Sequence, residues 1–331
     1  MSKKSKEKKN LKSSLLVLLL IAILLIASTY AWFTANRVVT ISSLNVQVEA
    51  QNGLQISTDA VDWKAVISNE DIATGYAGHK NQIPTVMEPV STAGEDDSAG
   101  RLRMFYGSVN PDDAGDYALT ATEETTEQAG DNGKYIAFDI FFKADTAMDI
   151  DLTDQSRVTS AATEKGLQNA TRVAFLVLGH GGADTQAATA QGWKTKEDLA
   201  IWEPNAGSHT SVAAASANST YFGGKTTVQA GAVDQSPIEY YGVKANITDS
   251  IKLSQVDTDG ANPTYFTKMT GLHSTNEAMT PVAGILNLEA GITKVRVYMW
   301  VEGQDVDCDN SASGSDITFD VQFEAPEDAG A

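Results

Sequence analysis

Alternating apolar and polar positions predict an extended strand near the start of the chain. Apolar residues occupy every second position from Leu44 to Ala50, which is the period of a strand with one covered face. Val39 and Ile41 fall on the opposite parity. Because the alternation changes phase between the two sets, we expect a bulge or bend near Ser42-Ser43.

Five later segments carry the clearest strand patterns: residues 136–142, 148–152, 172–178, 295–301 and 317–323. The segment 172–178 is nearly all apolar, as expected for a strand covered on both faces. Segments 295–301 and 317–323 predict a hairpin at the end of the chain. In its first strand, Tyr298 and Trp300 would lie on the face opposite the valines.

The segments between these strands are rich in turn-forming residues. We expect long loops near residues 70–130, with one strand at 102–109, and an insertion near residues 180–235. Short helices are predicted for residues 59–67 and 194–201. Many short strands with turns between them predict a mainly β fold, a jelly-roll-like antiparallel β-sandwich with long loops. Residues 34–326 would form this single domain, and residues 327–331 a disordered tail.

The first 33 residues follow a different pattern. Six lysines within the first 12 residues precede an apolar run from Leu15 to Ala27, which continues to Phe33. A basic head before an apolar stretch is typical of an export signal or of an N-terminal membrane anchor. We therefore expect the rest of the chain to be exported across the cytoplasmic membrane and to lie at the cell surface or outside the cell.

The sequence leaves two fates open for this leader. Its apolar core is about as long as that of a signal peptide, and Thr29-Tyr30-Ala31 places small residues where signal peptidase would cleave before Trp32. Residues 14–33 together also approach the roughly 20 residues of a membrane-spanning helix. They could instead be retained as a single-pass transmembrane anchor.

Charge narrows the range of partners. The chain has a formal net charge of −19, and its lysine-rich head makes the remainder more acidic still. Nucleic acid is a poor partner for such a domain, because phosphate binding needs patches of Lys and Arg. The one cysteine, Cys308, excludes an intramolecular disulfide, and we expect it to be a small buried apolar residue.

No motif in the sequence identifies a catalytic site. The four histidines are His79, His180, His209 and His273, and none lies in HExxH or at a metal-ligand spacing. The sequence contains no GxSxG motif, no SxxK motif beyond the lysine-rich head, and no Gly-rich nucleotide loop between a strand and a helix. We therefore expect a non-enzymatic protein without an organic cofactor.

One acidic segment has the spacing of a calcium-binding loop. Between Asp305 and Asp316, oxygen-bearing side chains occupy positions 1, 3, 5, 7, 9 and 12, as in loops that wrap one calcium ion. The candidate carboxylate ligands are Asp305, Asp307, Asp309 and Asp316. The sixth position is Asn310 instead of glycine, and strands rather than helices are expected on both sides. The alternative is a solvated acidic loop within the terminal hairpin.

The N-terminal region resembles a known family. The lysine-rich head, the Leu/Ile run, the stretch Ser28-Thr29-Tyr30-Ala31-Trp32-Phe33-Thr34 and the extended segment after it are similar to the N-termini of the TasA/camelysin group. These are exported proteins of Gram-positive bacteria that form biofilm-matrix fibres. The match lies mainly in residues 1–56. The resemblance implies a jelly-roll sandwich, removal of the leader by a dedicated signal peptidase, and self-association into fibres.

The resemblance also implies a role for the strand after the leader. In fibres of this family that segment is a donor strand, which completes the sheet of the neighbouring subunit. Five apolar residues would then fill the receiving groove: Val39, Ile41, Leu44, Val46 and Val48. The competing interpretation is that residues 36–50 form the first strand of the domain's own sheet.

We therefore expect a non-enzymatic extracellular structural protein, the subunit of a surface fibre or biofilm matrix that assembles by β-strand donation. The alternative is a membrane-tethered adhesion or binding domain that retains residues 14–33 and uses its long loops for recognition. A third possibility is a metallopeptidase, because camelysin-type proteins have been described as such. The sequence has no HExxH and no recognisable zinc triad to receive that role.

Overall fold

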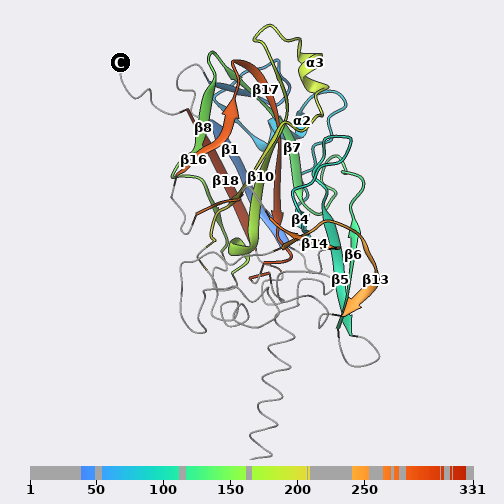
Figure 1. Cartoon of the computed structure of the whole chain (residues 1–331). Coiled ribbons are helices and arrows are strands. Elements are labelled where there is room, and N and C mark those ends of the chain that lie inside the picture. The colour runs from blue at the N-terminus through green and yellow to red at the C-terminus, as the bar shows by residue number, and fades with distance from the viewer. Residues whose placement is uncertain are drawn as a thin grey trace, which may run out of the picture.

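The chain folds into a mainly β structure with several sheets, most of whose strand pairs are antiparallel (Figure 1). We describe it from a computed structural model. The described residues are 39–48, 54–111, 117–161, 166–206, 208, 241–252, 264–269, 272–275, 281–305, 307–308, 314 and 316–325. The leader and the stretch 209–240 lie outside these residues, as does the tail from residue 326.

A six-stranded sheet forms the centre of the fold. Its order is β15 (Leu272–Ser274), β11 (Asp198–Glu203), β10 (Thr171–Gly181), β17 (Gly291–Val301), β7 (Ile136–Ala144) and β2 (Gln55–Ser57). Neighbouring strands are antiparallel except β11 and β15, which are parallel. Every residue of β17 is buried, because β10 and β7 occupy its two edges and other segments cover its two faces.

A seven-stranded sheet packs against one face of this sheet. Its main order is β16 (Val282–Leu288), β8 (Met148–Leu152), β18 (Asp316–Glu324), β1 (Val39–Val48) and β3 (Val66–Ile67). Two short strands attach to it, β4 (Val86–Met87) on β1 and β9 (Arg157–Thr159) on β18. The first and last described strands of the chain are therefore neighbours in one sheet.

The two large sheets share one hydrophobic core. It contains the inward side chains of β7, β10 and β17 together with those of β8, β16 and β18. Phe323 of β18 packs edge-on against Phe142 and Phe175 of the other sheet, with ring centroids 5.2 and 5.3 Å apart. Alternation along β18 places Ile317, Phe319, Val321 and Phe323 in this core, as expected for a strand with one covered face.

The opposite face of the six-stranded sheet is also covered. The segment 69–134 crosses it and contributes the buried residues Val90, Leu102 and Met104 to a second apolar cluster. This segment contains helix α2 (Asn69–Thr74), strand β5 (Phe105–Pro111) and strand β6 (Tyr117–Glu123).

Smaller elements complete the fold. Strands β5 and β6 form a three-stranded sheet with β13 (Ile247–Lys252), and β12 (Tyr241–Val243) pairs with β14 (Phe266–Lys268). The three-stranded sheet projects at the lower right of Figure 1. Helix α3 (Ala187–Gln191) and the 3-10 turn η3 (Leu167–Ala170) connect strands of the larger sheets.

Several expectations from the sequence are confirmed. The five strongest strand patterns correspond to β7, β8, β10, β17 and β18. The predicted irregularity near Ser42-Ser43 is present, because the pairing of β1 with β18 shifts between Ile41 and Ser43. Strand β10 is covered on both faces along Thr171–Gly179. Cys308 is buried, as expected.

The predicted C-terminal hairpin is wrong. Strands β17 and β18 follow each other in the chain but lie in different sheets. The reason is that β10 and β7 hydrogen-bond to both edges of β17, which leaves no edge for β18. The chain therefore crosses from one large sheet to the other between these strands.

Both predicted short helices are wrong as well. Within 59–67, the Asp59 side chain accepts hydrogen bonds from the backbone N–H groups of Val61 and Asp62, which forms a turn. The helix begins later, at α2, where Ser68 and Asp71 make a reciprocal capping box. In place of a helix over 194–201, β11 joins the central sheet beside β10. Residues 198–203 are therefore part of the central sheet, whereas residues 209–235 of the predicted insertion lie outside the described residues.

In the described part of the chain, no helix has the length and apolar character needed to cross a membrane. The leader predicted for residues 1–33 lies outside the described residues.

Candidate functional site

Strand β1, the candidate donor strand, lies within the domain's own sheet. It runs parallel to β18 in a register from Thr40 opposite Asp316 to Val48 opposite Phe323. The backbone positions of Val39, Ile41, Leu44, Val46 and Val48 all fall within this strand. The structure therefore gives an intramolecular pairing, as the competing interpretation from the sequence expected.

The other edge of β1 is only partly covered. Strand β3 pairs with Val46 and Gln47, and β4 pairs with Val39 and Thr40. Among the described strands, none pairs with residues 41–45 on this edge. The main-chain ladder to β18 is thus the principal attachment of β1, and β1 is close to being an edge strand.

The acidic loop after β17 is engaged with a buried arginine. The Arg172 guanidinium donates to one Asp305 oxygen at 2.6 Å and also pairs with Glu203. The other Asp305 oxygen accepts the Asp307 backbone N–H at 2.9 Å. Asp305 and Asp307 are buried and Asp316 is exposed at the start of β18, whereas Asp309 lies outside the described residues. The calcium interpretation remains a prediction.

The described residues contain no group of three or more His, Cys, Asp or Glu side chains placed to hold a metal ion. His180 pairs with Glu197 at 2.8 Å on the surface, and the Nδ1 atom of His79 accepts the Asn81 backbone N–H. His273 lies in the short strand β15, and His209 is outside the described residues.

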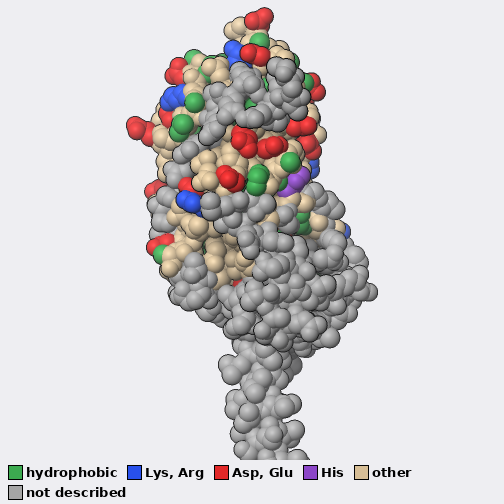
Figure 2. All heavy atoms as spheres, turned by 90° about the vertical axis from the view of Figure 1, so that its left-hand side faces the viewer, with side chains coloured by type: hydrophobic (Ala, Val, Ile, Leu, Met, Phe, Trp, Pro, Cys, Tyr) green, Lys and Arg blue, Asp and Glu red, His purple; other side chains and the backbone are tan. Residues whose placement is uncertain are grey.

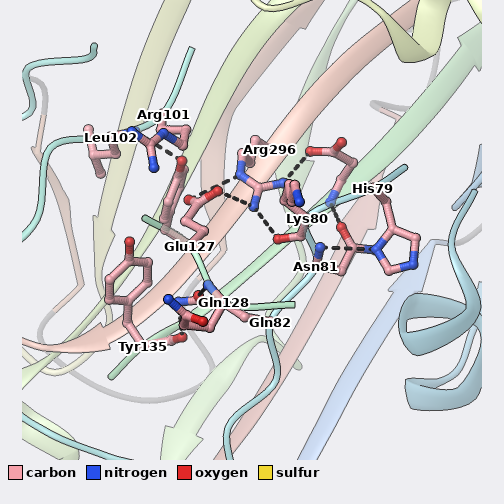
Figure 3. Close-up of polar contacts among 12 residues, drawn as sticks. His79, Lys80, Asn81, Gln82, Arg101, Leu102, Glu127, Gln128, Tyr135 and Arg296 are labelled. Atoms are coloured by element: carbon pink, nitrogen blue, oxygen red, sulfur yellow. Dashed lines mark hydrogen bonds and ion pairs between the residues drawn. The ribbon is translucent and has the colours of Figure 1, made fainter. Parts of the chain in front are cut away.

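The most developed polar site was not expected from the sequence. It is a network of charged residues between the six-stranded sheet and the segment 69–134 (Figure 3). Arg296 of β17 donates to Asp139 of β7 at 2.6 Å and to Glu127 at 2.7 and 3.4 Å. It also donates to the Lys80 carbonyl at 2.8 Å. One guanidinium thus joins two central strands to two points of the covering segment.

Lys294 extends this network along β17. Its ammonium lies 3.1 Å from Asp139 and donates to the backbone carbonyls of Gln191 and Trp193 at 2.8 and 3.1 Å. The Tyr76 hydroxyl donates to Asp139 at 2.6 Å. Each oxygen of the buried Asp139 carboxylate therefore has at least one charged partner.

Electrostatics favour the charged forms of Asp139 and Arg296. Burial alone would raise the pKa of Asp139, but Arg296 and Lys294 outweigh it and hold that pKa below its ordinary value. Burial would lower the pKa of Arg296, yet Asp139 and Glu127 raise it well above the ordinary value. Burial lowers the pKa of Lys294 despite the neighbouring Asp139. Burial raises the pKa of Tyr76, so its phenol remains a proton donor.

A cavity of about 400 Å³ opens beside the network. It lies among segments 76–80, 99–101, 126–127 and 191–194 and the outer face of the central sheet, which contributes Asp139, Leu178, Lys294 and Arg296. This volume falls within the range of small-molecule sites, roughly 300–1,000 Å³. The arrangement can hold a polar ligand, and its buried charges are already paired.

The sequence did not reveal this network because alternation along the strands predicts solvent-exposed positions for Asp139 and Arg296. Asp139 and Arg296 occupy the alternate positions of strands whose other face is apolar, so alternation alone places them in solvent. In the structure the segment 69–134 covers them. The one available signal was that the predicted strands 136–142 and 295–301 carry single charges of opposite sign, Asp139 and Arg296.

Comparisons with known proteins identify no relative: no family model matches the chain, and neither a curated protein nor a solved structure matches it.

Proposed function

We propose that the protein is a non-enzymatic extracellular structural protein, the subunit of a surface fibre or biofilm matrix that assembles by donating residues 36–50 to a neighbouring subunit. Its sandwich would have jelly-roll topology. The pairing of β1 with β18 is the observation that carries this proposal.

The position of β1 suits a strand that is exchanged between subunits. It is the first described strand, and the next one, β2, lies in the other large sheet. Apart from the two-residue contacts with β3 and β4, its described pairing is the ladder to β18. Strand addition to an open sheet edge gives affinity through main-chain hydrogen bonds and register through alternate side chains.

The energetics favour an exchange of β1 between subunits over the addition of β1 to a sheet edge that is already vacant. If β1 left its place, β18 would lose a register of eight paired positions, and each main-chain hydrogen bond contributes about 1 kcal/mol net. A vacant place would therefore cost several kcal/mol. The same strand from a neighbour would restore the same bonds, so concentration would decide between the closed monomer and the fibre.

The leader and the charge are compatible with this role. The basic head and apolar run predict export. Acidic side chains recur over the described part of the face in Figure 2, and a net charge far from zero favours solubility before assembly.

Deletion of residues 36–50 tests the proposal. The truncated protein should not form fibres, and a synthetic peptide of residues 36–50 should bind it and restore its thermal stability. A peptide with the same composition in scrambled order serves as the control. Fibres formed by the truncated protein would refute strand donation, and so would a failure of the peptide to restore stability.

A membrane-tethered binding domain is the second candidate, and the cavity beside Arg296 favours it. The two functions predict different mature N-termini. A native polypeptide that begins near Trp32 supports the fibre, whereas an intact lysine-rich head supports the tether.

A further inference from the structure

The cavity beside the buried network has an unusual charge for this protein. Residues 13–331 contain 18 of the 24 Lys and Arg residues and 42 of the 43 Asp and Glu residues. Five of those basic residues line the cavity, Lys80, Arg101, Lys194, Lys294 and Arg296, against two acidic ones, Glu127 and Asp139. The ratio of acid to base is thus inverted at this one site, which concentrates positive potential in an acidic domain.

The acidic residues of the lining are already neutralised. Glu127 pairs with Arg296, and Asp139 pairs with both Arg296 and Lys294. Since these four charges balance, the surplus positive charge comes from the other three basic residues of the lining, Lys80, Arg101 and Lys194, which we call the rim. A ligand that enters the cavity therefore meets cations whose charge is not cancelled inside the lining.

Two lysines of the rim are available for a ligand. Lys80 and Lys194 are exposed, and no hydrogen bond or ion pair of either ammonium occurs among the described residues. Arg101 is partly engaged, because its guanidinium donates to Asp97 and to the Thr125 carbonyl. Charge-assisted contacts to a carboxylate or a phosphate are the strongest that such ammonium groups make.

The backbone around these lysines is held in place. The Lys80 carbonyl accepts a hydrogen bond from Arg296 at 2.8 Å. Gly100 has φ +73°, and a Cβ atom there would lie 2.3 Å from the Lys194 carbonyl oxygen. Only glycine allows this close approach of the two loops. Both lysines therefore project from a preformed rim.

Two aromatic side chains, Tyr76 and Trp193, line the cavity. The Trp193 indole packs on the glycine face of β10, where a Cβ atom at Gly179 or Gly181 would lie within 3.0 Å of it. The Tyr76 hydroxyl is fixed by Asp139 and accepts from Lys294 at 3.2 Å. Both rings line the cavity and are half-buried, so the lining offers aromatic surface as well as cations.

We propose that this cavity binds a small organic anion, with its carboxylate or phosphate group at Lys80 and Lys194 and its body against Tyr76 and Trp193. An acidic sugar unit has this combination of a ring and one charged group. The proposal is independent of fibre assembly, because β1 does not contribute to the lining.

Binding of defined probes to the purified protein tests the inference. The probes are glucuronate and glucose 6-phosphate, which carry the two candidate anionic groups on similar rings, with glucose and inorganic phosphate as partial ligands. The readout is the chemical shift of the Trp193 indole N–H, assigned with the Trp193→Phe variant. At least one sugar anion should shift this signal saturably, more tightly than glucose or inorganic phosphate, and added salt should weaken the binding.

Matched variants identify the residues. The double substitution Lys80→Ala with Lys194→Ala should weaken binding by roughly tenfold or more, because two charge-assisted contacts are lost. Lys64→Ala removes an exposed lysine outside the lining and should leave binding unchanged. Binding of neither sugar anion would overturn the proposal. Equal affinity for glucose, equal affinity for inorganic phosphate, or unaltered binding by the double variant would overturn it too.

Discussion

Replacing Arg296 with methionine should strongly destabilise the protein. Methionine has a similar length but no charge, so the substitution leaves Asp139 and Glu127 buried without this partner. Asp139 keeps Lys294 and the Tyr76 hydroxyl. Among the described residues, Glu127 keeps no cation within ion-pair distance.

The magnitude follows from burial. The side chains of Arg296, Asp139 and Glu127 are between 2% and 4% exposed. Breaking a buried ion pair by removing one partner costs about 3–5 kcal/mol, because an uncompensated charge stays behind. At roughly 2–4 °C per kcal/mol for a large domain, Tm should fall by about 6–20 °C.

Urea denaturation followed by tryptophan fluorescence and far-UV circular dichroism measures this change. Arg157→Met is the matched control, because Arg157 pairs with Asp320 at 3.2 Å while remaining 43% exposed. Surface pairs of this kind contribute about 0–1 kcal/mol. Adding Glu127→Gln to Arg296→Met should recover part of the lost stability, since it removes the isolated charge.

Hydrogen exchange can locate the effect. Arg296 holds the covering segment through Lys80 and Glu127, so amides in segment 69–134 should lose protection first. A cost as small as that of Arg157→Met would refute the reasoning, because it would mean that the network is not buried as the structure describes.

Three further predictions follow from single residues. Burial raises the pKa of Glu302 from 4.5 to about 7, so between these pH values the folded state holds a proton that the unfolded chain has released. The free energy of unfolding should therefore fall by up to about 3 kcal/mol as pH rises from 4.5 to 7 and then level off. Urea titrations of Glu302→Gln over this pH range should lack the slope. Because Asp305 already has an arginine counter-ion, millimolar calcium should not raise Tm in wild type more than in Asp307→Ala, whereas a calcium-dependent rise lost in that variant would establish a metal site. Gly179→Ala should lower stability by about 1–3 kcal/mol, because φ is +147° and the new Cβ would lie 2.8 Å from Trp193; an unchanged urea midpoint would contradict this packing.

The pattern of apolar and polar positions within a segment was sufficient to predict several strands. The alternation along Ile317–Phe323 and the nearly all-apolar segment Arg172–Leu178 each predicted a strand and its covered faces correctly. The phase change near Ser42-Ser43 also predicted the register shift in β1. In each case the information lies within a few consecutive residues.

Strand pairing and the covering of the central sheet depend on contacts between segments distant in sequence, which the pattern within one segment does not contain. Proximity in the chain suggested that β17 pairs with β18, but β10 and β7 take both edges of β17. The segment Asp198–Glu203 becomes a strand because it pairs with an edge of β10, although a short helix was predicted for residues 194–201. Asp139 and Arg296 belong to a candidate site only because the segment 69–134 folds over them. The alternation of residues within their own strands gives no information about that contact.

Cysteine cross-linking across the β1–β18 ladder tests strand donation most directly. Gln47 and Gln322 are register partners, and neighbouring strands lie about 4.8 Å apart, which is within reach of a disulfide. With Cys308→Ala as background, the Q47C and Q322C single variants would be mixed under assembly conditions and oxidised. The control pairs Q47C with T318C, because the register partner of Thr318 is Ser43, four residues or about 13 Å along the strand from Gln47. Strand donation predicts a covalent link between different subunits through positions 47 and 322, found by mass spectrometry in the mixture but not in the control. The two cysteines can also be placed in one chain, in a Q47C/Q322C double variant. A disulfide that forms within single chains of this variant, and never between chains in the mixture, would contradict strand donation.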